Sequence, residues 1–249
     1  MSDKLGSLLP RPTGEQTFSL MPIRNTFFIL IILLLFTGCG GAEPTPTPPP
    51  PTPSLSAAMA DANSASAITI VAMGDSLTEG TGVDLEDAYP AQLERKLRAE
   101  GYDVSVINAG VGGETSSGAR SRVQWVLTLQ PDIVILETGA NDGLRGIDPA
   151  VTEQNMDELV AAFQQHNVTV VLAGMQIVEN MGPDYIEKFR AIYPAVAAKY
   201  EVILIPFFLE NVGGIPNLNQ SDSVHPTAAG YAVVVETIYP YVVEALEKK

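Results

Sequence analysis

Five short apolar runs alternate with amphipathic, charge-bearing stretches from about residue 67 to the C-terminus, and this alternation strongly constrains the fold. The expected strands lie near 68–73, 104–109, 132–138, 169–175 and 201–207. The expected helices lie near 88–100, 117–129, 150–165, 184–199 and 227–246. Because strands separated by helical segments form βαβ units, the pattern predicts one parallel sheet with helices on both faces.

Polar segments follow the carboxyl ends of several expected strands. They are Gly74-Asp75-Ser76-Leu77 after the first strand, 108–116 after the second, 137–143 after the third, and 221–226 in the long connection after the fifth. The carboxyl ends of parallel strands lie on one edge of a sheet, where α/β folds place ligands. We therefore expect these four segments to converge.

Ser76 is the candidate nucleophile because it leaves the carboxyl end of the first expected strand. A serine hydroxyl is a weak nucleophile until a base accepts its proton. An alternative is purely structural, since Ser76-Leu77-Thr78-Glu79 also fits a helix capping box. The base must then be sought among the two histidines of the chain.

His225 is the candidate base, since it lies in a polar segment at the expected active edge. Asp222, three residues earlier, could accept a hydrogen bond from one imidazole nitrogen and stabilise the imidazolium. The alternative for this pair is a turn or helix cap ahead of Pro226. His166 stands where a helix is expected to end, and we expect a capping or exposed role for it.

Attack by a serine on a carbonyl carbon creates an oxyanion, which requires hydrogen-bond donors held in place beforehand. Gly112-Gly113 allows backbone N–H groups to approach a ligand closely, because no side chain intervenes. Asn141 offers a side-chain amide. The alternatives are a plain glycine turn and an Asn-Asp-Gly turn.

The segment around Ser76 is not the Gly-x-Ser-x-Gly elbow of α/β hydrolases, because Thr78 stands in place of the second glycine. Ser76, Gly113, Asn141 and His225, with Asp222 completing Asp-x-x-His, instead resemble the four blocks of the GDSL, or SGNH, hydrolases. Three further segments resemble the multifunctional thioesterase I/lysophospholipase/arylesterase branch of that family: 141–146, 191–194 and 205–208.

This resemblance, over about 68–245, implies a flavodoxin-like three-layer α/β/α sandwich with a five-stranded parallel sheet. It implies that Ser76 attacks the acyl carbonyl, that His225 acts as base and then acid, and that Asp222 orients His225. The N–H groups of Ser76 and Gly113 and the Asn141 amide would hold the oxyanion. Neither a metal nor an organic cofactor is implied.

Three residues are expected to contact the substrate: Asp75, Ile177 and Met181. The last two belong to segment 176–181, where close relatives usually carry a proline. Glu179-Asn180 in this segment is therefore expected to alter the acyl groove.

The first 66 residues do not resemble a domain. An apolar run at 27–36, preceded by Arg24, is typical of a signal-peptide core, and residues 1–39 resemble a bacterial lipoprotein signal with Cys39 as the lipidated residue. Met21 is a plausible true start. Residues 40–66 are rich in Pro, Thr and small residues and predict an extended, disordered tether to a domain at 67–249.

The predicted domain is acidic, with 11 basic and 25 acidic residues after residue 66 and a net charge of −14. This charge excludes a basic footprint for nucleic acid. We expect a monomeric, exported lipoprotein that is anchored by Cys39 and faces the periplasm or the extracellular side. It would hydrolyse carboxylic esters such as lysophospholipids and short- or medium-chain acyl esters, with thioesters also accessible. The alternatives are a carbohydrate O-acetyl esterase and a catalytically silent surface binding module.

Overall fold

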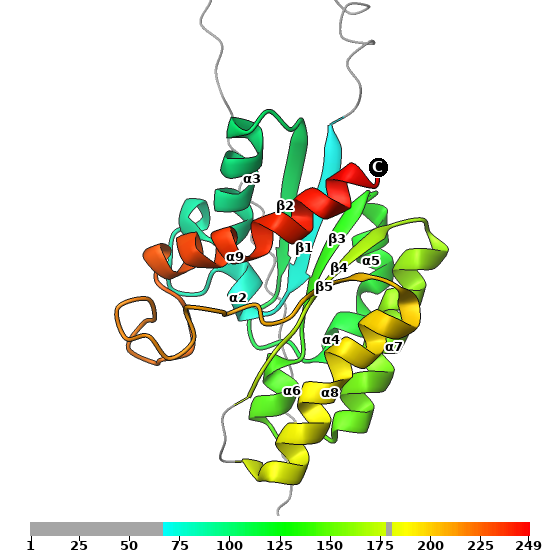
Figure 1. Cartoon of the computed structure of the whole chain (residues 1–249), viewed down its shortest axis with the longest axis vertical. Coiled ribbons are helices and arrows are strands. Elements are labelled where there is room, and N and C mark those ends of the chain that lie inside the picture. The colour runs from blue at the N-terminus through cyan, green and yellow to red at the C-terminus, as the bar shows by residue number, and fades with distance from the viewer. Residues whose placement is uncertain (1–66, 178–180) are drawn as a thin grey trace, which may run out of the picture. The chain divides into compact units, whose positions relative to one another are not determined.

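The computed structural model describes residues 67–177 and 181–249. The predicted signal segment, Cys39 and the tether lie outside the described residues, as do residues 178–180. Five parallel strands form one sheet in the order β2-β1-β3-β4-β5 (Figure 1). The strands are β1 Ile68–Gly74, β2 Val104–Gly110, β3 Ile133–Glu137, β4 Thr169–Ala173 and β5 Ile203–Ile205. The predicted fold class is confirmed.

Helices cover both faces of this sheet (Figure 1). The helices are α2 Ser76–Glu79, α3 Tyr89–Ala99, α4 Ser116–Ser121, α5 Val123–Thr128, α6 Ala140–Leu144, α7 Pro149–Gln165, α8 Pro183–Tyr200 and α9 Ala228–Glu247, with a 3-10 turn η2 at Leu85–Asp87. On one face α3 packs against α9, and on the other α7 packs against α4, α5 and α8.

The elements differ from the expected ones at three places. The helix expected at 117–129 is divided at Arg122 into α4 and α5. The strand expected at 201–207 is reduced to β5, since Pro206 has no N–H for the ladder and the N–H of Val202 bonds Ala197 at the end of α8. The short helices α2 and α6 were not expected, because four or five residues carry too little periodicity to detect.

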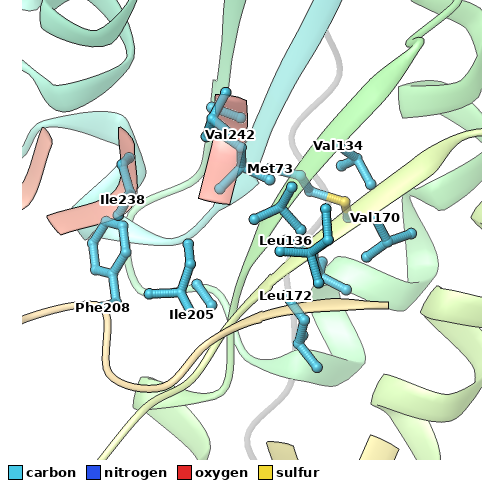
Figure 2. Close-up of a cluster of buried hydrophobic side chains, with 14 of the residues drawn as sticks. Met73, Val134, Leu136, Val170, Leu172, Ile205, Phe208, Ile238 and Val242 are labelled. Atoms are coloured by element: carbon cyan, nitrogen blue, oxygen red, sulfur yellow. The ribbon is translucent and has the colours of Figure 1, made fainter. Parts of the chain in front are cut away.

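The core on the α9 face joins the sheet to the last helix. Figure 2 shows Ile238 and Val242, one helical turn apart on α9, near Ile205 and Phe208 from the end of the sheet. All four side chains are fully buried. Burying an aliphatic or aromatic side chain of this size contributes about 1.5–3 kcal/mol, so this packing fixes the strand ends from which the functional loops leave.

Candidate active site

Ser76, His225 and Asp222 form a continuous hydrogen-bonded chain. Ser76 is the first residue of α2, directly after β1, and the other two belong to the connection between β5 and α9. Ser76 Oγ lies 2.9 Å from His225 Nε2, and His225 Nδ1 lies 2.7 Å from Asp222 Oδ2. The structure thus brings together a hydroxyl, an imidazole and a carboxylate that are up to 149 positions apart in sequence.

Asp222 is held by its own loop as well as by the imidazole. Its Oδ1 accepts the backbone N–H groups of Val224 at 2.9 Å and of His225 at 3.0 Å. These hydrogen bonds, first the one from the His225 ring and then the two from the backbone, lower the pKa of Asp222 to about 2. Asp222 is therefore a carboxylate at neutral pH and keeps the proton of the imidazole on Nδ1, leaving Nε2 to face Ser76.

The turn that carries Ser76 is capped by Asp75, whose carboxylate accepts the Leu77 N–H at 3.0 Å. Asp75 also accepts a hydrogen bond from Asn141 Nδ2 at 3.0 Å. The capping-box interpretation of Ser76 is therefore wrong: Asp75 is the cap, and the Ser76 hydroxyl faces His225. Asp75, expected to contact substrate, is almost wholly buried with its carboxylate turned toward these two partners.

Two further segments approach this turn. Gly113 lies in a tight turn closed by a hydrogen bond from Glu114 N to Val111 O, with a φ of +75° that favours glycine. Asn141 lies in α6 after β3. Among the described residues, the N–H groups of Ser76 and Gly113 donate no hydrogen bond, and Asn141 Nδ2 uses one of its two protons on Asp75. Three donors thus remain for a ligand at this edge.

Arg145 joins the two donor segments, and sequence reasoning missed it. Its Nη2 donates to Gly113 O at 2.7 Å and lies 3.4 Å from Asn141 Oδ1. The buried Asp142 makes a second link, because its carboxylate accepts the N–H of Ser116 at 2.8 Å. The only sequence signal for Arg145 was its place in the segment 141–146.

An ion pair fixes the Gly113 segment to the end of β1. Arg122 binds Glu114 through Nε and Nη2 at 2.6–2.9 Å, and both side chains are largely buried. Arg122 Nη2 also donates to Gly74 O at 3.1 Å. Such a two-pronged pair restricts orientation as well as distance, so it sets the Gly113 turn relative to Ser76.

A cavity of about 350 Å³ reaches Leu77, the residue after Ser76, and Val224, the residue before His225. Its lining is mainly apolar and comes from the residue after Ser76, from α6, and from the connections after β4 and β5. It includes Leu77, Ala140, Leu144, Met175, Ile177 and Phe207. The volume lies in the usual range of small-molecule sites. Of the two expected contacts in segment 176–181, Ile177 lines this cavity, whereas Met181 is not among the lining residues and lies against Gly146.

The second histidine stands apart from this site. His166 ends α7, is exposed, and places Nδ1 2.9 Å from Ala162 O, in agreement with the expected capping role. Within residues 67–177 and 181–249, no group of three or more His, Cys, Asp or Glu side chains could hold a metal ion.

Comparison with known proteins places this geometry in a family. Residues 72–233 match the GDSL-like lipase/acylhydrolase family. The chain is 40% identical over 173 residues to the esterase TesA of Pseudomonas aeruginosa, covering 69% of this chain and 86% of that protein. It is 37% identical over 159 residues to thioesterase 1/protease 1/lysophospholipase L1 of Escherichia coli K12, covering 64% of this chain and 75% of that protein.

A solved structure shows the same architecture. The crystal structure of AlinE4, an SGNH-hydrolase family esterase, superposes with a TM-score of 0.61 at 42% identity, covering 72% of this chain and 97% of AlinE4. The resemblance seen in the sequence is confirmed. The chain belongs to the GDSL-like lipase/acylhydrolase family and is a serine esterase.

Proposed function

We propose that the protein hydrolyses carboxylic esters through an acyl-enzyme on Ser76. The observation that carries this proposal is the 2.9 Å contact between Ser76 Oγ and His225 Nε2, at the end of a chain that starts at the ionised Asp222. A nucleophile within hydrogen-bond reach of a base, which is itself oriented by a third group, is the arrangement that activates a serine.

The reaction would take place in two halves. His225 Nε2 accepts the Ser76 proton as Oγ attacks the acyl carbonyl, and the imidazolium then gives that proton to the departing alkoxide. The alcohol leaves and the acyl group stays on Ser76. In the second half, His225 takes a proton from water, the hydroxide attacks the acyl carbon, and Ser76 recovers its proton as the carboxylic acid departs.

The negative charge on the carbonyl oxygen requires the donors described above. We assign this role to the N–H groups of Ser76 and Gly113 and to the free amide proton of Asn141. Hydrogen bonds connect the segments that carry these donors: Arg145 joins the Gly113 and Asn141 segments, and Asn141 binds Asp75 beside Ser76. Donors held in this way need no rearrangement when the charge develops.

The apolar cavity favours an acyl chain over a sugar as the group beside Ser76. Leu77, Leu144, Ile177 and Phe207 offer contacts to methylene groups. We therefore propose lysophospholipids and short- or medium-chain acyl esters as substrates, with thioesters open to the same attack. The names of the Escherichia coli relative, thioesterase 1 and lysophospholipase L1, agree with this range.

Export and lipid attachment at Cys39 stay part of the proposal and rest on the sequence of residues 1–39. Among the described residues, no helix has both the length and the apolarity to cross a membrane. If the leader exports the domain, the enzyme does not meet the acyl-CoA of the cytosol, and a membrane-derived ester is the natural substrate we propose.

A substrate series tests this proposal. The full-length protein is assayed on p-nitrophenyl esters of increasing chain length, on lysophospholipid and on an acetylated glycan, with Ser76→Ala as the matched inactive variant. We expect a medium-chain optimum that disappears in Ser76→Ala. Preference for the glycan would replace the substrate class, and turnover that survives Ser76→Ala would refute the enzyme mechanism.

A further inference from the structure

Glu137 is a buried acid with no part in the reaction described above. It is the last residue of β3, and its side chain has no exposed surface. Its Oε2 accepts the backbone N–H of Asp75 at 3.2 Å and the Thr78 hydroxyl at 2.8 Å. Tyr89 OH lies 3.2 Å from Thr78 Oγ1 and extends this chain. Glu137 thus holds the turn that carries Ser76 on both sides of that serine.

Gly74 permits this close approach. A β-carbon built at Gly74 would collide with Glu137 Oε2, with Thr78 Oγ1 and with the Glu137 carbonyl oxygen. The glycine that opens Gly74-Asp75-Ser76-Leu77 is therefore required by the acid beneath it. The nucleophile turn and Glu137 fit together as one unit.

Glu137 has no positive partner. The titratable groups that face it are Asp75 and three buried tyrosines, Tyr89 of α3, Tyr193 of α8 and Tyr231 of α9. Among the described residues no Lys, Arg or His pairs with it, and Oε1 is buried without a hydrogen-bonding partner. An isolated carboxylate is far too costly in such surroundings.

One of the two neighbouring acids must therefore keep its proton. Burial first, and then the charge of Asp75, hold the pKa of Glu137 well above its usual range. Burial raises the pKa of Asp75 as well, but Asp75 accepts two N–H donors and faces His225, both of which favour its charged form. The single negative charge of the pair belongs on Asp75.

We propose that Glu137 is a neutral carboxylic acid in the active protein and acts as a positioning residue for Ser76. Its Oε2 accepts the two hydrogen bonds that hold the turn, and its proton keeps a second negative charge away from the edge where the oxyanion forms. The protonation state stands independently of the reaction, whereas the effect on turnover rests on the proposed function.

Infrared difference spectroscopy of the full-length protein tests the protonation state without any substrate. At pH 7 the wild type should show the carbonyl stretch of a protonated carboxylic acid, and Glu137→Gln should lack this band. Tyr231→Phe, which removes a hydroxyl facing Glu137 that has no hydrogen-bonding partner among the described residues, is the matched control and should keep the band. A wild-type spectrum without the band would overturn the proposal.

The pH dependence of stability gives a second, independent readout. Folded Glu137 keeps a proton that the unfolded chain releases near its ordinary pKa of 4.5, so the contribution of Glu137 to wild-type stability falls as pH rises above that value. Glu137→Gln does not titrate and escapes this loss. The unfolding midpoint of Glu137→Gln relative to wild type should therefore increase from pH 5 to pH 8. A constant difference would count against a proton on Glu137.

Turnover separates a positioning role from mere filling of space. Glu137→Gln keeps an acceptor oxygen for both donors, so we expect kcat within about threefold of wild type. Glu137→Ala frees the turn and should lower kcat about 10- to 100-fold with KM little changed. Equal kcat values in both variants would refute the positioning role, and a poorly folding Glu137→Ala leaves the spectroscopic result to decide the protonation state.

Discussion

Two acids at the same edge of the sheet, Asp222 and Glu137, are in opposite states. Asp222 has a side chain that is 46% exposed and accepts three hydrogen bonds from one short segment, and its pKa falls to about 2. Glu137 has no exposed surface and no positive partner, and its pKa lies well above the usual range. The protonation state of each acid is therefore set by its hydrogen-bond donors and its contact with solvent, not by the residue type alone.

In the proposed mechanism the two acids have different tasks. Asp222 would supply the charge that makes His225 a base, and Asp222 must be ionised to do so. Glu137 would hold the backbone around Ser76, which a neutral acid can do without electrostatic cost. The following variants test this division, starting with the largest expected effect.

Loss of the nucleophile or of the base should have the largest effect. Ser76→Ala and His225→Ala are each expected to lower kcat by about 10⁴-fold or more, because the two groups act as a unit. Ser121→Ala and His166→Ala change surface residues of the same types and are the matched controls. Steady-state assays with a p-nitrophenyl ester measure the effect, and near-normal turnover in either active-site variant would contradict the account.

Removing the charge of Asp222 comes next. Asp222→Asn should reduce kcat by about 10³- to 10⁴-fold, because the amide can hold the wrong tautomer of His225. Asp184→Asn, at an exposed position in the first turn of α8, should leave kcat unchanged. If Asp222→Asn retained wild-type kcat, the charge of Asp222 would not be needed for His225 to act as a base.

Removal of the Asn141 side chain should lower kcat less than the loss of Ser76, of His225 or of the Asp222 charge. Asn141→Ala removes a hydrogen bond to Asp75 and the proposed oxyanion donor, and about 10²- to 10³-fold lower kcat is expected. Asn217→Ala, at an exposed position, is the control. An effect confined to KM would place Asn141 in ground-state binding instead.

The pH profile sharpens the contrast between the two acids. Activity should fall in acid, because a general base must be unprotonated to accept the Ser76 proton. Since the pKa of Asp222 is lowered to about 2, this carboxylate gains its proton only in strong acid and does not cause a loss of activity at milder pH. A kcat/KM that stays constant down to strong acid would argue against an acid-sensitive base beside Ser76.

The smallest effect is expected in the cavity. Ile177→Ala should change kcat/KM for medium-chain esters by about 10-fold or less and leave short-chain esters nearly unaffected, because only longer chains reach this side chain. Val151→Ala, on the surface of α7, is the control. The same loss for every chain length would show that Ile177 acts on the site itself rather than on the acyl chain.

The sequence predicted the parts of the molecule that repeat a simple pattern. The apolar runs located all five strands, and β3 is buried throughout, as a central parallel strand should be. The convergence of Ser76, Asn141 and His225 followed from topology, since all of them come after strands of one parallel sheet. The family resemblance assigned a role to each of these residues, which their spacing alone left open.

The remainder depended on contacts between distant segments. Nothing near Asp75 in sequence indicates that its carboxylate binds Asn141, 66 positions away. Glu137 did leave a signal, an acid at the end of a wholly apolar strand, where a charge is rarely found. Its meaning required the knowledge that Glu137 lies against Gly74 and Thr78, which are distant from it in sequence and meet it only in the folded chain.

The covalent intermediate is the most direct test of the central claim. The full-length protein is mixed with a p-nitrophenyl ester, quenched in acid within the first turnovers, digested and examined by mass spectrometry. We expect one acyl group on the peptide that contains Ser76, and none in Ser76→Ala or after long incubation. Wild-type turnover that leaves Ser76 unmodified, or an acyl group on another residue, would contradict it.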